Sequence, residues 1–297
     1  MDISKEKRAI EYLKAFEPES EPYYACYSGG KDSDVIRILL TLAGVKHELH
    51  HNLTTVDAPE TVRYVKSIPE IIIDRPEKNM FSLIVEKMFP PTRLARYCCE
   101  RLKERGGSGR LKVTGVRWAE SMARRENGGF VKIIGKPVTV TKTAEGIGAN
   151  FISTNKGGVV LNDDNTATRQ VVERCYRTTS TMINPIVDWT DADVWDFLRH
   201  YGCRSNPLYE CGYKRVGCVG CPLGGYTAQK LEFLRYPKYR ALYVRAFDKM
   251  LEAREQHGLE NRITWRNGEN VMTWWTGGDV LQISIDDYLD EIERVDE

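Results

Sequence analysis

The sequence has almost no excess of charge of either sign. Its 43 Lys and Arg residues face 42 Asp and Glu residues, so the formal net charge is +1. This balance does not indicate a strongly basic protein that coats nucleic acid, although it allows a local basic patch. With 41% hydrophobic and 29% charged residues, the composition is that of an ordinary globular protein.

The chain also lacks long apolar segments. No run is long enough to span a bilayer, and residues 1–8 are charged, unlike the apolar core of a signal peptide. We therefore expect a cytoplasmic protein that makes no membrane contact. Thiols stay reduced in that compartment, so the eight cysteines predict free thiols or metal ligands rather than a disulfide framework.

The most informative stretch is a glycine pair between a predicted strand and a predicted helix. Residues 23–27 are aromatic and apolar, as in strands, and residues 35–40 carry apolar side chains at helical spacing. Such a turn presents backbone N–H groups and the positive end of a helix dipole to an anion. The pattern predicts a phosphate-binding loop, although it lacks the spacing of a Walker A loop. The loop residues are Ser28, Gly29, Gly30, Lys31, Asp32 and Ser33.

Ser-Gly-Gly-Lys-Asp-Ser resembles the PP-loop of the ATP pyrophosphatases, which cleave ATP between the α and β phosphates. That group includes the phosphoadenosine phosphosulfate (PAPS) reductases and the tRNA thiolation enzymes. The resemblance implies an α/β fold of the adenine-nucleotide α-hydrolase kind, with a mainly parallel sheet and helices on both faces. It also implies that residues 28–33 bind ATP with Mg²⁺. A Gly-rich turn without a ligand is the alternative.

Two further stretches supply candidates for the nucleotide site. Residues 57–61 resemble the Asp-Thr-Gly…Phe-Pro-Glu-Thr stretch that lies beside the nucleotide in PAPS reductases, which makes Asp57 a candidate; a helix start is the alternative. Arg117 follows a predicted strand at 111–115, and the carboxyl ends of parallel strands hold ligands in such folds. We therefore expect Arg117 to bind a phosphate or sulfate, with a surface arginine as the alternative.

The cysteines gather in two places. Cys98 and Cys99 are adjacent in a helix predicted over 93–103, and Cys218 and Cys221 flank two residues. One Cys-x-x-Cys pair supplies half of a tetrahedral thiolate site, so the tandem pair and Cys175 are the candidates for the remaining ligands. Because neighbouring helical residues diverge by about 100°, one of the tandem pair would instead face the core if Cys175 is the fourth ligand.

A tandem pair with a later Cys-x-x-Cys is similar to the [4Fe–4S] pattern of plant-type and bacterial adenylylsulfate reductases. The chain also looks like the iron–sulfur ATP pyrophosphatase of DNA phosphorothioation systems, with which it shares the turn 99–103 and the segment 184–189. These resemblances imply a [4Fe–4S] cluster, with zinc on the same thiolates as the alternative. The reductases use a cysteine in a C-terminal Glu-Cys-Gly tail, and no cysteine follows Cys221 here.

The leading hypothesis is therefore an ATP-using iron–sulfur enzyme of sulfur transfer, which adenylates an acceptor and releases pyrophosphate. Lys31 and Arg117 would stabilise phosphate charge, and Lys103 is a third catalytic candidate because a nearby lysine favours a thiolate. A sulfonucleotide reductase is the second hypothesis, and a non-catalytic nucleotide-binding module with structural zinc is the third. The expected partners are an adenine nucleotide, a sulfur or electron donor protein and a nucleic-acid or small-molecule acceptor; self-association is left open.

The predicted organisation is a nucleotide-binding α/β domain over residues 1–200 and a C-terminal portion over 201–297 with the second cysteine pair. Residues 128–165 predict β-hairpins or a flap, because Gly, Thr and Asn alternate with short apolar stretches. An apolar stripe over 239–251 predicts a packed helix, and Ser284 begins a last predicted helix.

Overall fold

The computed structural model describes residues 3–135, 137–154, 158–262 and 264–278. They belong to two compact units that interleave along the chain. Of the described residues, the first unit comprises those up to 52, those in 59–74 and those in 105–216, and the second comprises those in 53–58, 75–104 and from 217 on. The predicted division at residue 200 stays a prediction. In the structure, residues 201–216 belong to the first unit, where Asn206 contacts the loop at Gly29, and residues 53–58 and 75–104 belong to the second.

The first unit is built on a sheet with eight strands among the described residues, in the order β3-β2-β1-β4-β8-β5-β7-β6. Strands β3, β2, β1, β4 and β8 run parallel, and β5, β7 and β6 extend one edge in antiparallel pairs. This is the mainly parallel α/β fold that the PP-loop resemblance implies, which confirms the fold class. The strands are β1 (Tyr23–Cys26), β2 (His47–Asn52), β3 (Ile71–Asp74), β4 (Lys112–Val113), β5 (Val131–Ile134), β6 (Ile152–Ser153), β7 (Val159–Leu161) and β8 (Ser180–Ile183).

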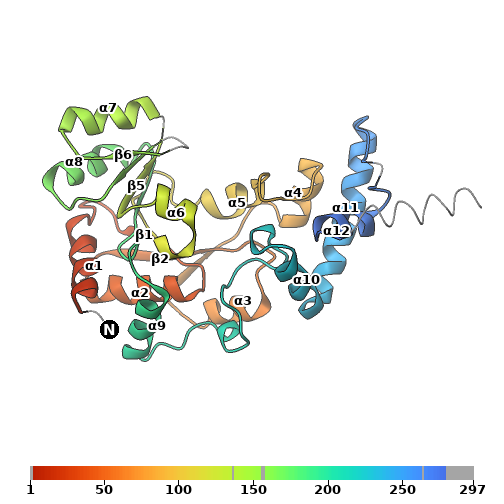
Figure 1. Cartoon of the computed structure of the whole chain (residues 1–297), viewed down its shortest axis with the longest axis horizontal. Coiled ribbons are helices and arrows are strands. Elements are labelled where there is room, and N and C mark those ends of the chain that lie inside the picture. The colour runs from red at the N-terminus through yellow and green to blue at the C-terminus, as the bar shows by residue number, and fades with distance from the viewer. Residues whose placement is uncertain (1–2, 136, 155–157, 263, 279–297) are drawn as a thin grey trace, which may run out of the picture. The chain divides into compact units, whose positions relative to one another are not determined.

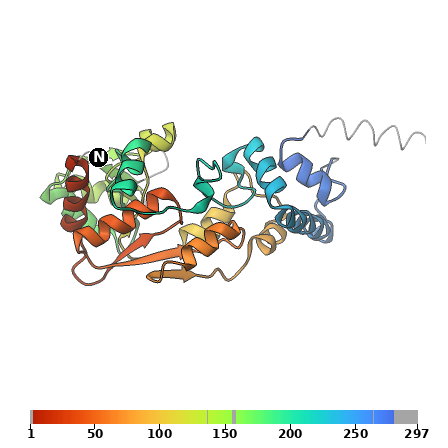
Figure 2. The same ribbon diagram turned by 90° about the horizontal axis from the view of Figure 1, so that it is seen from below.

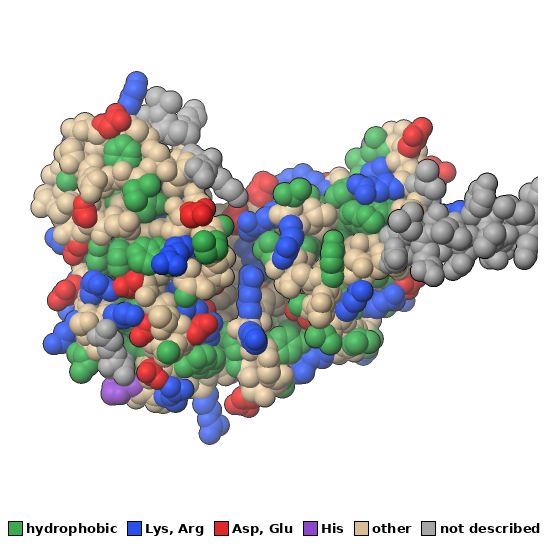
Figure 3. Space-filling view, viewed as in Figure 1, with side chains coloured by type: hydrophobic (Ala, Val, Ile, Leu, Met, Phe, Trp, Pro, Cys, Tyr) green, Lys and Arg blue, Asp and Glu red, His purple; other side chains and the backbone are tan. Residues whose placement is uncertain are grey.

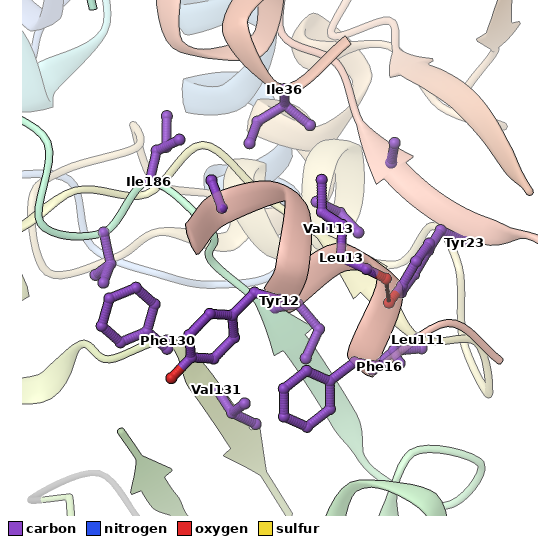
Figure 4. Packing of buried hydrophobic residues seen from close by; sticks show 14 of the residues in the cluster. Tyr12, Leu13, Phe16, Tyr23, Ile36, Leu111, Val113, Phe130, Val131 and Ile186 are labelled. Atoms are coloured by element: carbon purple, nitrogen blue, oxygen red, sulfur yellow. Dashed lines mark hydrogen bonds between the residues drawn. The ribbon is translucent and has the colours of Figure 1, made fainter. Parts of the chain in front are cut away.

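The core of the first unit contains an aromatic group beneath α1 (Ile3–Ala15). The apolar face of this helix carries Tyr12, whose ring stacks on Phe130 at 4.6 Å and on Phe16 at 5.8 Å between ring centroids. Tyr23 also belongs to the core, and its hydroxyl donates to the carbonyl of Leu13 at 2.8 Å (Figure 4). Burying a side chain of this size stabilises the fold by roughly 2–3 kcal/mol.

The other helices of the first unit follow its strands. The predicted stop of α2 at Gly44 is confirmed, since Gly44 has the left-handed φ of 67° that a helix end favours. The stretch predicted as hairpins or a flap instead contains the helix α7, with strands that extend the sheet. The helices are α2 (Lys31–Ala43), α3 (Pro59–Lys66), α6 (Met122–Asn127), α7 (Pro137–Ile147), α8 (Thr166–Cys175) and α9 (Asp191–His200) (Figure 1).

The second unit is helical in its described part. Helix α11 packs against α4 and α12, and the α10–α12 helices lie together in both ribbon views (Figures 1 and 2). The predicted apolar stripe is confirmed, with Tyr243 and Phe247 against Trp275 at 4.9 and 5.4 Å between ring centroids. The helix predicted from Ser284 lies outside the described residues. The helices are α4 (Met80–Lys87), α5 (Tyr97–Cys99), the π-helical η1 (Glu100–Glu104), α10 (Tyr226–Arg235), α11 (Pro237–Gln256) and α12 (Gly268–Trp275).

The surface matches the balanced composition. Acidic and basic side chains are interspersed on the face drawn in Figure 3. Within the described ranges, none of the helices has the length and apolarity that a membrane crossing requires.

Candidate functional site

The predicted phosphate loop connects the carboxyl end of β1 to the start of α2. Ser33 fixes the turn, because its Oγ accepts from the Gly30 N–H at 3.1 Å and donates to the Gly30 carbonyl at 2.7 Å. The Ser28 hydroxyl donates to Ser33 Oγ at 3.3 Å. Two hydroxyls therefore lie at the N-terminus of α2, where the helix dipole favours an anion.

The short turn η3 (Pro207–Tyr209) supports this loop. Asn206 is fully buried, and its Nδ2 donates to the Gly29 carbonyl and to Thr61 Oγ1, both at 3.0 Å. The Tyr209 hydroxyl accepts from the backbone N–H of Lys31 at 3.0 Å. Sequence analysis missed both residues, since Asn206-Pro207 signals only a turn and nothing local shows that this turn reaches the loop.

Arg117 lies at the centre of a charged network beside the loop. Its side chain is 2% exposed, so the alternative of a surface arginine does not hold. Its guanidinium donates to Asp32 Oδ1 at 2.7 Å, to Asp191 Oδ1 at 2.8 Å and to the Trp189 carbonyl at 3.1 Å. Lys31 Nζ lies 3.3 Å from Asp32 Oδ2 and 3.4 Å from Asp191 Oδ1.

The sheet topology explains why these residues meet. Lys31 and Asp32 follow β1, Arg117 follows β4 and Asp191 follows β8, and these three parallel strands are neighbours. The strand order reverses between β1 and β4, and ligands bind at such a reversal, beyond the carboxyl ends of the strands. Gly115 permits the close approach, because a Cβ there would lie 3.0 Å from the Asp32 backbone.

Asp191 is the member of this network that sequence analysis missed. It opens α9 directly after Thr190, which forms the predicted capping box with Asp193. Burial acts to raise the pKa of Asp191, but the hydrogen bond from Arg117 and the charge of Lys31 outweigh it and hold the pKa below its ordinary value. Its side chain is 70% exposed, whereas that of Lys31 is 10% exposed.

The second unit brings together four of the five predicted thiols. Cys98 and Cys99 hydrogen-bond to each other, and Cys98 is within electrostatic reach of Cys218 and Cys221. We refer to these four residues as the thiol group. Cys175 is not part of it, because Cys175 lies in the hydrophobic core of the first unit.

Local backbone shapes build the thiol group. The regular helix predicted over 93–103 is instead the short α5 followed by the wider π-helical turn η1. Between Cys218 and Cys221, Gly220 has a left-handed φ of 74°, and a Cβ there would lie 2.3 Å from Phe233. The Gly220 N–H donates to Glu232 at 2.6 Å, which ties the Cys-x-x-Cys turn to α10.

Lys103 and Asp57 also lie at the thiol group. Lys103 hydrogen-bonds to Cys218, and the negative charge available on that sulfur raises the pKa of the lysine. Asp57 pairs with Cys218 in an isolated β-bridge, and its carboxylate accepts from the Thr54 N–H at 2.7 Å. The structure therefore places Asp57 in the second unit with the thiols, and its expected role at the nucleotide stays a prediction.

The chemistry of these donors fits a thiolate-bound metal centre. Four sulfurs are the ligand set of an iron–sulfur cluster and of a structural zinc site, and the positive charge of Lys103 compensates for thiolate charge. Across the part of the chain that the structure describes, no three His, Cys, Asp or Glu side chains are arranged to hold a single metal ion.

One known protein family matches the part of the chain that contains both groups of residues. Residues 22–223 match the model of the phosphoadenosine phosphosulfate reductase domain. The match spans more than half of the chain and includes both the phosphate loop and the thiol group. The chain belongs to this family, and it is an enzyme of the PAPS reductase-like type.

Individual relatives are similar over shorter stretches. An adenosine 5'-phosphosulfate reductase of Allochromatium vinosum is 46% identical over 39 residues, which are 13% of this chain and 15% of that protein. An uncharacterized protein of Methanocaldococcus jannaschii is 25% identical over 261 residues, covering 86% of this chain and 47% of that protein. The chain thus spans less than half the length of these relatives.

Solved structures give weaker matches. A PAPS reductase from Candida auris in a phosphate complex has a TM-score of 0.43 at 17% identity, covering 71% of this chain and 87% of that one. An FMN adenylyltransferase from Candida glabrata, in complex with FMN and an ATP analogue, has a TM-score of 0.37 at 14% identity, covering 73% and 65%.

Proposed function

We propose that this protein is an ATP-dependent enzyme of sulfur transfer. An acceptor oxygen attacks the α-phosphorus of ATP, an O–P bond forms, and the bond to the bridging oxygen breaks as pyrophosphate leaves. The acceptor is thereby adenylated. A sulfide-level sulfur nucleophile from the donor then attacks the atom that bears the adenylated oxygen, a bond to sulfur forms, and the bond to that oxygen breaks as AMP leaves. The observation that carries the proposal is the convergence of Lys31, Asp32 and Arg117 beside a phosphate loop at the carboxyl ends of parallel strands.

The chain's own residues supply most of this chemistry. The N-terminus of α2 and Lys31 would bind the β and γ phosphates, where charge accumulates as pyrophosphate departs. Arg117 would hold the Asp32 carboxylate in place beside the loop, since its guanidinium is already bound on both sides. Removing one such electrostatic group typically slows catalysis by about 10²–10³.

The four residues of the thiol group would hold a [4Fe–4S] cluster, which supplies sulfur or electrons when it is bound. Lys103 would compensate the charge of the thiolates around it. A zinc ion on the same residues is the alternative and would favour the third hypothesis, a nucleotide-binding module without turnover.

Anaerobic purification followed by incubation with ATP, Mg²⁺ and candidate acceptors tests the proposal. We expect AMP and pyrophosphate as products, with iron and sulfide in the protein, and loss of about 10²–10³ in rate in Lys31→Ala. Lys46→Ala, which also removes one lysine of the first unit, is the control that should keep full rate. Formation of ADP and inorganic phosphate, or a colourless zinc protein, would contradict it.

A sulfonucleotide reductase is the second candidate, favoured by the similarity to adenosine 5'-phosphosulfate reductases. Thioredoxin-dependent release of sulfite from adenylylsulfate, without pyrophosphate formation from ATP, would identify that activity. A nucleic acid as the sulfur acceptor, as the resemblance to the phosphorothioation enzymes implies, stays a prediction, and oligonucleotides therefore belong among the acceptors tested.

A further inference from the structure

We infer that Asp191 makes the nucleotide site selective for a metal-complexed triphosphate and disfavours a metal-free sulfonucleotide. The inference rests on the proposed function and deepens it, because it names the form of nucleotide that the site accepts. It is carried by the position of the Asp191 carboxylate between the two cations of the site.

The four charges form a closed arrangement. Asp32 accepts from Arg117 at 2.7 Å and lies 3.3 Å from Lys31. Asp191 accepts from the same guanidinium at 2.8 Å and lies 3.4 Å from the same ammonium. Each carboxylate thus faces both cations, and the two positive and two negative side chains cancel.

Because the charges of these four side chains cancel, they favour a ligand that brings its own cation. A nucleoside triphosphate carries several negative charges, and these four side chains together offer no net charge to attract them, which leaves the attraction to the N-terminus of α2. A divalent cation changes the balance, because Mg²⁺ is commonly bound through one or two carboxylates together with substrate phosphates. Asp32 and Asp191 face the same ammonium and are suited to share such an ion with the phosphates.

Of the two carboxylates, Asp32 and Asp191, the second is better suited to a test by mutation. Its side chain is 70% exposed and accessible to a ligand, whereas that of Asp32 is 21% exposed. The start of α9 is capped by Thr190 and Asp193, so Asp191 is not needed for the cap. Asp191→Asn therefore removes one charge and keeps an acceptor for Arg117.

Binding of a non-hydrolysable α,β-methylene ATP, measured with Mg²⁺ and with EDTA, tests the inference independently of turnover. We expect the wild type to lose about 100-fold in affinity without Mg²⁺ and Asp191→Asn to lose less than about 10-fold, mainly because it binds the metal-free analogue more tightly. The variant should also bind metal-free adenylylsulfate more tightly. Asp191→Glu, which keeps the charge, should retain the Mg²⁺ dependence.

Asp196→Asn is the matched control, since it removes the same charge from the same helix and should keep the wild-type ratio. The inference is overturned if Asp191→Asn keeps that ratio, if Asp196→Asn lowers it equally, or if the wild type binds the analogue equally well in EDTA. A thermal melt checks that both variants are folded. Absence of pyrophosphate release with the Mg²⁺ linkage intact would instead reject the proposed function alone.

Discussion

In the first unit, the charged side chains of the nucleotide site follow three neighbouring parallel strands. In the second unit, two of the four thiols come from the short helix α5 and two from the turn that precedes α10, more than a hundred residues later in the chain. Strand order therefore explains the meeting of Lys31, Arg117 and Asp191. No such rule brings Cys98 to Cys218, which depends on how the helices of the second unit pack.

The largest effect is expected for a substitution in the thiol group that leaves the nucleotide site unchanged. Cys218→Ser is expected to remove most of the iron and sulfide from the anaerobically purified protein, because the proposed cluster would lose one of its four ligands. Nucleotide binding should persist, since its residues belong to the first unit. Metal analysis and binding of the ATP analogue check both statements.

Cys175→Ser is the control for that experiment. It should leave the iron content unchanged and lower the melting temperature, because it puts a hydroxyl into the hydrophobic core. Loss of iron in this variant would show that Cys175 is a ligand after all.

A smaller effect is expected at Gly115, where the nucleotide site depends on strand packing. In Gly115→Ala, a Cβ of ideal geometry would lie 3.0 Å from the backbone of Asp32, which is closer than real Cβ contacts normally come. The strain should destabilise the protein by about 1–3 kcal/mol and weaken nucleotide binding. Gly146→Ala is a suitable comparison, because no atom lies within 4 Å of the added Cβ there. Equal melting temperatures for the two variants would contradict this account of Gly115.

Tyr209→Phe should have a milder effect. It removes the hydroxyl that accepts from the Lys31 N–H and keeps the ring. We expect a change of about 0.5–1.5 kcal/mol, the usual contribution of one hydrogen bond, in the free energy of unfolding or of nucleotide binding. Denaturant unfolding and titration with the ATP analogue measure the two. An unchanged value in both would show that Tyr209 does not support the loop.

The smallest effect is expected at Glu48 on β2, away from both sites. Its hydrogen bonds with Arg110 (2.6 Å) and His50 (3.2 Å) hold the pKa of Glu48 below its ordinary value. The stabilisation is present above the unfolded pKa of about 4.3 and is lost as the pH falls through the lowered pKa. Because the side chain is 40% exposed, we expect only a few tenths of a kcal/mol. Glu48→Gln should flatten the fall in melting temperature between about pH 5 and pH 3; a wild-type slope would contradict this.

Much of the first unit could be predicted from local patterns. The strand, loop and helix around residues 28–33, the helix stop at Gly44 and the capping box at Thr190 all depend on neighbouring residues, and the structure shows each of them. Asp191 and Tyr209 could not be found in this way, because their partners lie more than seventy residues away.

The thiols and the edge of the sheet show the same limit. Cysteine spacing alone left five candidate ligands, and only tertiary packing puts Cys175 into the core of the other unit. Within 128–165, threonine and valine favour strands locally, yet residues 138–140 lie in α7. Packing outweighs the local β propensity of these residues.

The interleaving of the two units limits how this protein can be divided or recombined. The chain passes from one unit to the other at 52/53, 58/59, 74/75, 104/105 and 216/217. No single cut separates the two units, because residues 1–216 contain the whole first unit but also carry residues 53–58 and 75–104 of the second. Neither unit can therefore be exchanged between genes as an uninterrupted cassette. A hybrid that replaces the thiol region must therefore exchange all three segments of the second unit together.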